Sequence, residues 1–463
     1  MFVLAIYYKI GKGTEKNLEK SFYWCQEAAE NGVKEAMFVL AICYINGERT
    51  EKNLEKSFYW CQEAAENGVK EAMFVLAIYY INGVRTEKNL EKAFHWFQKA
   101  VENGNENAMF NLAKCYYNGV GTEKNLEKAF HWLQKAAENG DEKAIFDLAK
   151  CYYIGEGTEK NLEKAFHWYQ KAVENGNENA MFNLAKCYYN GVGTEKNLEK
   201  AFHWLQKAAE NGDEEAIFYL AKCYYIEKGT EKNFEKAFHW FQKAAENENG
   251  NKKAMLNLGM CYVIGNGTEV NIEKAFHWFQ KAAEDGNEEA MYILAKFYEC
   301  GEGTEKNLEK ALYLYQKAAE NGNKESMYCL ADYYYHGKKT EKNLEKAIYW
   351  YQKAAENGDK NAMHNLAICY HFGKGTEQNL EKSFHWYQKA AENGDEDAMF
   401  NLAIHYFSGY VTERNLEKAF YWYQKAAENG SIEAMLSLAI CYKCGIGTEK
   451  NLEKAFHWFQ KAA

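Results

Sequence analysis

The sequence of 463 residues contains no proline, although average usage would give roughly twenty. Proline interrupts helix interiors because it lacks the backbone N–H and clashes with the preceding turn, so its absence favours helices joined by short glycine turns. There is also no uninterrupted apolar run of about 18 residues, the length that crosses a membrane. The opening segment MFVLAIYYKIGKGT lacks the basic leader and small-residue cleavage site of a secretory signal. These absences predict a helical, cytoplasmic protein that is not inserted into a membrane.

Concentrated positive charge is missing as well. The formal net charge is −10, and acidic and basic residues are spread along the chain. Domains that bind nucleic acid instead carry a basic patch or stripe. We therefore expect no nucleic-acid partner.

The thirteen cysteines are an odd number. Eight of them recur at one position of the repeat described below: Cys43, Cys115, Cys151, Cys187, Cys223, Cys261, Cys369 and Cys441. Equivalent positions in stacked helical repeats lie about 8–10 Å apart, whereas the α-carbons of a disulfide lie within roughly 7 Å. The pattern predicts small buried thiols in a reducing compartment.

Tryptophan reveals the organisation of the chain. It recurs every 36 residues, at Trp24, Trp60, Trp96, Trp132, Trp168, Trp204, Trp240, Trp278, Trp350, Trp386, Trp422 and Trp458. Two irregularities are a step of 38 residues from Trp240 to Trp278 and Leu314 at one expected tryptophan position. Within the period 105–140, helical spacing places two sets of residues each on one face: Ala108, Met109, Leu112, Ala113 and Tyr116, then Leu126, Ala129, Phe130, Trp132, Leu133 and Ala136.

The boundaries of the two helices are also visible. Asn125, present in all thirteen periods, stands at an N-cap position, and Gly140 suits a helix C-terminus. The turn GVGT joins the helices; its first glycine becomes Glu227 once, and its second becomes Arg49, Arg85, Lys339 and Val411. Because one helix pair cannot bury its apolar faces, stacking must supply the core. We predict an all-α, right-handed α-solenoid of about thirteen 36-residue helix-turn-helix repeats, locally weak at Leu314.

The pattern A-x-x-x-L-A-x-x-Y-x-x-G-x-G-T followed by N-L-E-K-A-x-x-W-x-x-K-A-A-E-x-G covers almost the whole chain. It resembles the Sel-1-like repeat family, a relative of the tetratricopeptide repeats. Ala113 usually replaces the family's glycine, although Gly259 keeps it, and Thr122 stands where valine is common. The resemblance implies a scaffold or adaptor, of the kind found in degradation, signalling and fungal cell-wall synthesis, and arrays of this type are typical of fungi.

No constellation in the sequence predicts catalysis, a cofactor or a metal site. The eight histidines that precede tryptophan, His95, His131, His167, His203, His239, His277, His385 and His457, stand one repeat apart and cannot converge on one zinc ion. Cys441 and Cys444 form a C-x-x-C without a second pair, and the turn glycines lack the lysine and serine of a phosphate loop. Residues 98–142 and 170–214 are identical, so the chain multiplies its elements where an active site needs a unique set. We expect no enzyme activity.

Binding is expected on the first helices, which should line a concave surface. The positions predicted to be free of packing are those of Phe110, Lys114, Tyr117 and Asn118. The Lys114 position is isoleucine at Ile6, Ile42 and Ile78, lysine in the middle repeats, Met260 and Asp332 at two points, and isoleucine again at Ile368, Ile404 and Ile440. The candidate partner-binding residues are Phe110, Lys114, Tyr117, Asn118, Lys150, Tyr153, Phe182, Lys186, Tyr189, Asn190, Lys222, Tyr225 and Lys296. Lysine beside aromatics suits acidic or C-terminal peptide segments; the alternative is an ordinary solvated helix face.

We expect one continuous solenoid over 1–463 with a kink or hinge near 226–252, where two residues are inserted and Glu227 and Lys228 are irregular. Met1 falls inside a first helix and Ala463 inside a second. The expectation is therefore a chain truncated at both ends, with end-to-end self-association or a missing flanking domain covering them. The predicted function is a non-catalytic protein-interaction scaffold; the alternative is a regulatory or targeting arm of a larger signalling enzyme such as a protein kinase.

Overall fold

The computed structural model describes residues 1–84, 86–247, 250–338 and 340–463. Arg85 and Lys339, two replacements of the second turn glycine, and the inserted residues 248 and 249 lie outside the described residues. The chain divides into two compact units, the N-terminal unit Met1–Lys232 and the C-terminal unit Asn233–Ala463. Their boundary falls within 226–252, where the sequence predicts a hinge, and the hinge stays a prediction.

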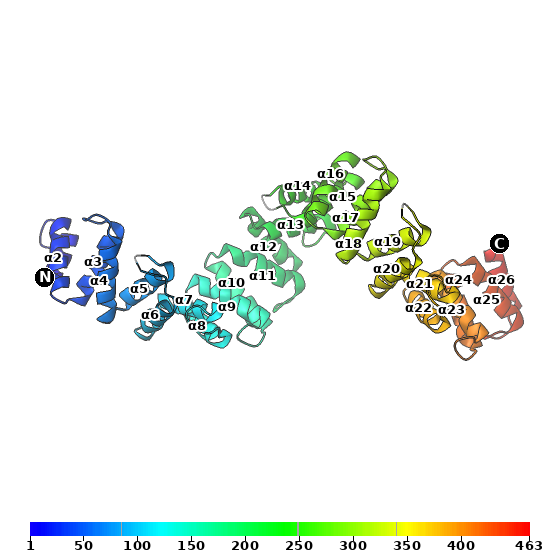
Figure 1. Cartoon of the computed structure of the whole chain (residues 1–463), viewed down its shortest axis with the longest axis horizontal. Coiled ribbons are helices and arrows are strands. Elements are labelled where there is room, and N and C mark those ends of the chain that lie inside the picture. The colour runs from blue at the N-terminus through cyan, green and yellow to red at the C-terminus, as the bar shows by residue number, and fades with distance from the viewer. Residues whose placement is uncertain (85, 248–249, 339) are drawn as a thin grey trace. The chain divides into compact units, whose positions relative to one another are not determined.

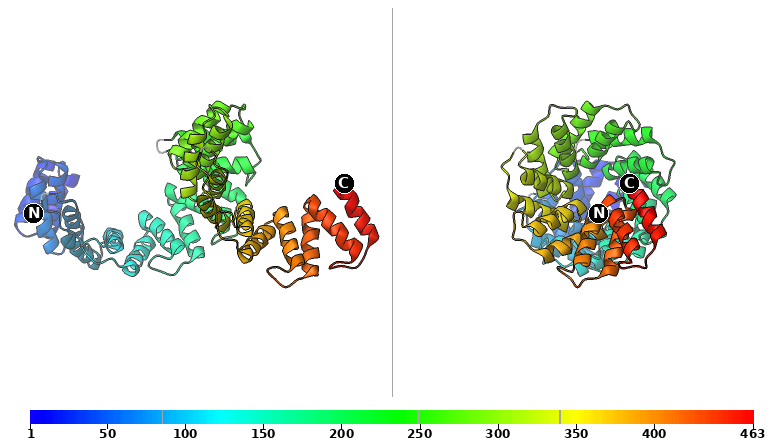
Figure 2. Two further views of the ribbon diagram at one scale, coloured as in Figure 1. Left: turned by 45° about the vertical axis from the view of Figure 1, so that its right-hand side comes forward. Right: turned by 90° about the vertical axis from the view of Figure 1, so that its right-hand side faces the viewer.

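The described residues form twenty-six α-helices and no strand. Within each unit the helices follow one another in chain order as stacked hairpins (Figures 1 and 2). This arrangement confirms the predicted all-α solenoid of thirteen helix-turn-helix repeats.

The bounds of the helices repeat with the period of the sequence. In the N-terminal unit the first helices of the repeats are α1 (Phe2–Ile10), α3 (Lys34–Asn46), α5 (Lys70–Asn82), α7 (Asn107–Asn118), α9 (Glu142–Ile154), α11 (Glu178–Asn190) and α13 (Glu214–Ile226). Its second helices are α2 (Leu18–Glu30), α4 (Leu54–Glu66), α6 (Leu90–Glu102), α8 (Leu126–Glu138), α10 (Leu162–Glu174) and α12 (Leu198–Glu210). In the C-terminal unit the first helices are α15 (Lys252–Ile264), α17 (Glu288–Cys300), α19 (Lys324–His336), α21 (Lys360–Phe372), α23 (Glu396–Ser408) and α25 (Ile432–Cys444). Its second helices are α14 (Phe234–Glu246), α16 (Ile272–Glu284), α18 (Leu308–Glu320), α20 (Leu344–Glu356), α22 (Leu380–Glu392), α24 (Leu416–Glu428) and α26 (Leu452–Ala462).

The predicted asparagine caps are present at every second helix. Asn125 Oδ1 accepts a hydrogen bond of 2.9 Å from the backbone N–H of Lys128, and the backbone of Asn125 is extended, as an N-cap requires. The same bond occurs at the asparagine that precedes each of the other second helices. These caps satisfy a backbone donor that has no partner within the helix, so each repeat sets the start of its own second helix.

Replacing Asn161 by alanine removes one such cap, whose bond to the Lys164 N–H measures 2.9 Å. We expect the first turn of α10 to lose about 1 kcal/mol of local stability, measured by hydrogen exchange of its amides. Aspartate at the same position keeps an acceptor and should restore most of the protection. Equal exchange in the alanine variant and the natural chain would contradict a stabilising cap.

The second glycine of each turn lies against the preceding repeat. A Cβ built on Gly157, which has φ +71°, would lie 2.1 Å from the carbonyl oxygen of Leu126 at the start of α8. The approach is looser at Gly303, where the corresponding oxygen of Ile272 would be 3.1 Å away. Arg49 replaces the second turn glycine in another repeat and has φ 68°. Glu227 replaces the first turn glycine and has φ 56°, so both adopt the left-handed backbone. The turn therefore tolerates other residues in some repeats, as the sequence indicates, but the contact across repeats is not uniform.

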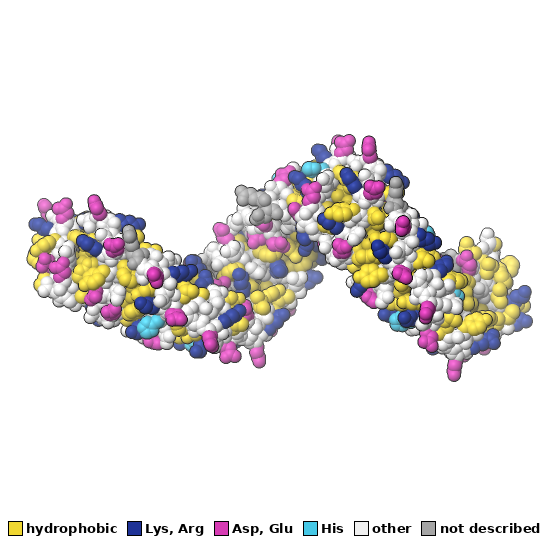
Figure 3. All heavy atoms as spheres, viewed as in Figure 1, with side chains coloured by type: hydrophobic (Ala, Val, Ile, Leu, Met, Phe, Trp, Pro, Cys, Tyr) yellow, Lys and Arg dark blue, Asp and Glu magenta, His cyan; other side chains and the backbone are white. Residues whose placement is uncertain are grey.

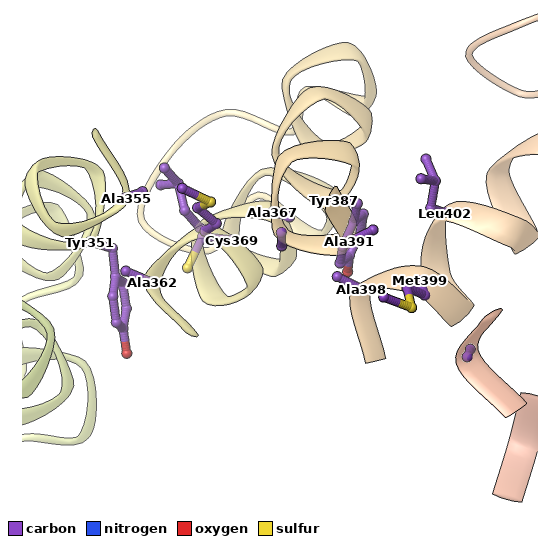
Figure 4. Packing of buried hydrophobic residues seen from close by; sticks show 14 of the residues in the cluster. Tyr351, Ala355, Ala362, Ala367, Cys369, Tyr387, Ala391, Ala398, Met399 and Leu402 are labelled. Carbon is purple, nitrogen blue, oxygen red and sulfur yellow. The ribbon is translucent and has the colours of Figure 1, made fainter. Parts of the chain in front are cut away.

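The core runs along the interior of each unit between the two layers of helices. Alanines such as Ala129, Ala136 and Ala137 are buried and allow close helix approach. Most of the fully buried aromatic side chains come from the position that follows tryptophan in the repeat, as Tyr351 shows; Tyr387, also buried, occupies the same position (Figure 4). Tryptophan itself, such as Trp132, is only half-buried, so it marks the repeat more clearly than it fills the core.

The thiols largely follow the sequence prediction. Seven of the eight cysteines at the common position are buried, Cys43 is half-buried, and all are free. Burial raises the pKa of the Cys151 thiol to about 12, so it stays protonated and unreactive at neutral pH. Cys300 and Cys444 are exposed.

Candidate peptide-binding surface

Four of the predicted binding residues line one pocket between α7 and α9. Lys114, Tyr117, Asn118 and Lys150 surround a volume of about 240 Å³. Ala113, Leu133, Cys151 and Ile154 complete its apolar lining, and Asp147 and Glu156 add carboxylates. We call this set of polar and charged residues, Lys114, Tyr117, Asn118, Asp147, Lys150 and Glu156, the first lysine surface.

The carboxylates of the first lysine surface were not among the residues predicted from sequence, and they change its charge. The Tyr117 hydroxyl donates a hydrogen bond of 2.8 Å to Glu156 Oε2. Burial raises the pKa of Asp147, while the charges of Lys150 and Lys114 act in the opposite direction. With two lysines and two carboxylates, the surface has no formal net charge.

The lysines lie over aromatic rings one helical turn earlier. Lys114 Nζ is 4.7 Å from the centroid of the Phe110 ring, and Lys150 Nζ is 4.2 Å from that of Phe146. Such cation–π contacts orient a lysine without neutralising its charge. Phe110 itself is 7% exposed and belongs to the core. The prediction that its position is free of packing is therefore wrong, and its role is to support Lys114.

The duplicated block provides a second surface of different charge between α11 and α13. Lys186, Tyr189 and Asn190 repeat Lys114, Tyr117 and Asn118, but Tyr219 replaces Asp147 and Lys228 replaces Glu156. Lys228 Nζ lies 5.1 Å from the Tyr189 ring centroid, and a hydrogen bond with Tyr189 raises the pKa of Lys228. We call Lys186, Tyr189, Asn190, Lys222 and Lys228 the second lysine surface. Its three lysines leave a net charge of +2 even when the exposed Glu227 is included.

The remaining predicted residues of this unit lie on the same first-helix surface. Asn118 and Asn190 are exposed, while Tyr153, Phe182, Tyr189, Lys222 and Tyr225 are half-buried. Lys186 Nζ lies 5.5 Å from the centroid of the Phe182 ring. The Phe182 and Tyr219 ring centroids are 5.6 Å apart. The Tyr153 ring centroid is 6.4 Å from that of Tyr169. Aromatic side chains therefore form the base of the second lysine surface, and lysines form its top.

Several first helices carry an asparagine three residues before the lysine position. Its amide group could serve a partner's backbone, but in the structure it has a partner within the chain. Asn183 Nδ2 donates to the Asn179 carbonyl at 3.1 Å, one turn earlier in its own helix. Asn111, Asn257 and Asn401 make the same kind of bond. Because their amide groups already donate to a backbone carbonyl of the same helix, we do not include them in the binding surface.

Lys296, in the C-terminal unit, has an acidic neighbour. Its Nζ lies 3.5 Å from Glu299 Oε2, which also accepts a 2.8 Å hydrogen bond from the Tyr315 hydroxyl. Burial alone would raise the Glu299 pKa, but the Tyr315 hydrogen bond and the Lys296 charge hold it below its usual value. Asp332 is paired in turn with His336 and Lys338 at 3.2 and 3.1 Å. The Lys114 position therefore does not form a continuous positively charged stripe along the repeats, because carboxylates accompany some of its lysines.

Other candidate chemistry was also located in the structure. The eight histidines before tryptophan are exposed on the second helices. Among the residues that the structure describes, no three His, Cys, Asp or Glu side chains are grouped so as to hold a metal ion. Each helix in the described part of the chain is too short or too polar to span a membrane.

Stacked two-helix repeats with one aromatic register define the chain as a helical-repeat solenoid. The family model Sel1 repeat matches thirteen consecutive segments: 1–33, 34–69, 70–105, 107–141, 142–177, 179–213, 214–249, 252–287, 288–323, 324–359, 360–395, 396–431 and 432–463. The chain belongs to the Sel1 repeat family. Proteins of this family are in general scaffolds for protein interactions.

Two solved structures illustrate the relationship. A protective antigen present in uropathogenic Escherichia coli strains, described as displaying an SLR fold, is 31% identical with a TM-score of 0.73, over 95% of this chain and 94% of that one. A Sel1 repeat protein from Oxalobacter formigenes is 27% identical with a TM-score of 0.54, over 67% of this chain and 89% of that one. No protein of curated function matches the chain.

Proposed function

We propose that the chain is a non-catalytic scaffold of the cytoplasm that binds acidic segments of partner proteins on its first helices, above all at the second lysine surface. The observation that carries this proposal is the contrast within the duplicated block. The same local sequence is followed by Asp147 and Glu156 in one copy and by Tyr219 and Lys228 in the other. The second copy therefore combines three lysines with an aromatic base.

Physical reasons support an acidic peptide as the ligand. Lysine ammonium groups bind carboxylates through charge-assisted hydrogen bonds, and half-buried sites such as Lys186 and Lys222 are screened less by salt than fully exposed ones. Lys186 is held over Phe182, which reduces the entropy lost on binding. The free, buried cysteines fit a reducing compartment.

The duplication supplies a matched control for the test. The double variant Lys186→Glu/Lys222→Glu should bind fluorescein-labelled hexaglutamate at least about tenfold more weakly than the natural chain, because reversing two charges removes attraction and adds repulsion. The variant Lys114→Glu/Lys150→Glu changes equivalent positions beside Asp147 and Glu156, so we expect about a threefold loss at most. Fluorescence anisotropy at 50 and 150 mM NaCl measures both. Equal losses in the two variants, or no loss in either, would contradict the assignment of the site.

A further inference from the structure

The C-terminal unit contains a hollow where the repeat lacks its tryptophan. In other repeats of this unit the indole is half-buried and the lysine three residues later covers it. Lys281 Nζ lies 4.9 Å from the Trp278 ring in the preceding repeat, and Lys389 Nζ lies 5.0 Å from the Trp386 ring two repeats further on, measured to the centroids. In α18, Leu314 stands at this position, and Lys317 lies over the Tyr313 ring instead, at 4.9 Å. Lys425 also lies over a tyrosine ring, that of Tyr421 at 6.0 Å, in a repeat that has its tryptophan, so the feature that sets the Leu314 repeat apart is the missing indole itself.

The hollow at Leu314 has a volume of about 750 Å³. Ala283, Met291, Leu294, Tyr298 and Leu314 supply its apolar wall. Lys310, Lys317, Glu284 and Glu320 lie around it and give it charges of both signs. A volume of this size with apolar walls and a few polar groups is typical of ligand sites in proteins.

The equivalent place one repeat earlier shows what the missing ring does. There Ala245, Met255 and Glu284 correspond to Ala283, Met291 and Glu320, and the Trp278 ring forms part of the wall of a smaller volume of about 450 Å³. Leu294 and Tyr298 line the hollow at Leu314, but their counterparts do not line the place beside Trp278. The hollow at Leu314 therefore reaches a deeper apolar surface than the place beside Trp278.

We propose that this hollow binds a tryptophan side chain from a segment of another protein. The hollow keeps the alanine and methionine that line the equivalent place beside Trp278, and Lys317 is free of an indole of its own chain. An incoming indole would bury apolar area and gain a cation–π contact with Lys317. The charges around the hollow suit the polar backbone of a peptide. This site is separate from the lysine surfaces and does not depend on them.

The test uses the tripeptide acetyl-Gly-Trp-Gly-amide as the probe and saturation-transfer NMR with the full chain. We expect binding of this peptide but not of acetyl-Gly-Leu-Gly-amide. Leu314→Trp fills the hollow with the residue that the other repeats carry, so its affinity for the tryptophan peptide should fall at least about tenfold. The variant should keep a thermal midpoint at or above that of the natural chain.

A second substitution controls for adding a tryptophan as such. Leu436→Trp introduces the same residue at a 43% exposed position of α25, and it should leave the affinity unchanged. Absence of binding to the natural chain, undiminished binding to Leu314→Trp, or equal weakening by Leu436→Trp would each overturn the proposal. Free indole binding as tightly as the peptide would also overturn it, because the site would then serve a small molecule.

Discussion

Replacing Gly157 by alanine is expected to lower the stability of the contact between its repeat and the preceding one by about 3–4 kcal/mol. The left-handed backbone costs an L-residue about 1–2 kcal/mol. The new Cβ would also lie 2.1 Å from the Leu126 carbonyl oxygen and 2.7 Å from its carbon, and forced overpacking costs about 1–3 kcal/mol. The clash is with backbone at the start of α8, so a side-chain rotation cannot relieve it and the two repeats must move apart.

The same substitution at Gly303 is the matched control. Its φ is +63°, but the nearest backbone oxygen would be 3.1 Å away and the closest atom, at 2.9 Å, belongs to the Ile272 side chain. We expect a loss of about 1–2 kcal/mol there, mainly from the left-handed backbone. Hydrogen exchange of α9 and α17 measures the local opening free energy of each repeat. A loss at Gly303 as large as that at Gly157 would show that backbone conformation, and not the contact between repeats, sets the cost.

Acidification from pH 6.5 to 4 is expected to destabilise the C-terminal unit around α23 by about 3 kcal/mol. His405 is 5% exposed and occupies the position held by cysteine in most repeats. Burial, with a smaller contribution from the charge of His371, lowers the His405 pKa from 6.5 to about 4. Between these pH values the unfolded state binds a proton that the folded state does not, so stability falls as the pH falls. Each pKa unit is worth about 1.4 kcal/mol.

His405→Phe should remove this dependence while keeping an aromatic ring, since Phe297 is buried at the same position of another repeat. The readout is the difference in local stability of α23 between pH 6.5 and pH 4, from hydrogen exchange corrected for the intrinsic rate. Asp395, bonded to His364 at 3.2 Å, does not interfere. Burial would raise the Asp395 pKa, but the hydrogen bonds from His364 and the Ala398 N–H, together with the charges of His364 and Lys360, lower it below 3.8, so its contribution is lost only at lower pH. An equal pH dependence in the variant would exclude His405 as the cause.

The parts of the fold that depend on neighbours in sequence could be predicted. Asn125 reveals an N-cap because a side-chain oxygen three residues before a backbone N–H is a local arrangement. The 36-residue spacing of tryptophans such as Trp132 gives the number of repeats, and the spacing of apolar residues within one repeat gives the buried face of each of its two helices. All of these signals lie within one helix or turn, where geometry follows directly from residue order.

The charge of the binding surface could not be predicted in this way. Tyr117 donates a hydrogen bond to Glu156 across 39 residues, and Tyr315 of the next helix donates one to Glu299. The residue at the lysine position does not by itself indicate either carboxylate. A signal was present: Asp147 and Tyr219 occupy the same position of repeats that otherwise match closely. Phe110 was misjudged for a related reason, because whether its ring is buried depends on the helices of the adjacent repeat.

Within each unit the principal contacts join helices that are consecutive in the chain. A block of 36 residues can consequently be gained or lost without depriving the remaining helices of the kind of neighbour they need. The identity of 98–142 and 170–214 fits one such gain of two repeats. Asp147 and Glu156 follow one copy where Tyr219 and Lys228 follow the other, so two otherwise matching repeats carry surfaces of different charge. The array can therefore change length by whole repeats, and each added repeat provides another first-helix surface on which a new binding specificity can arise.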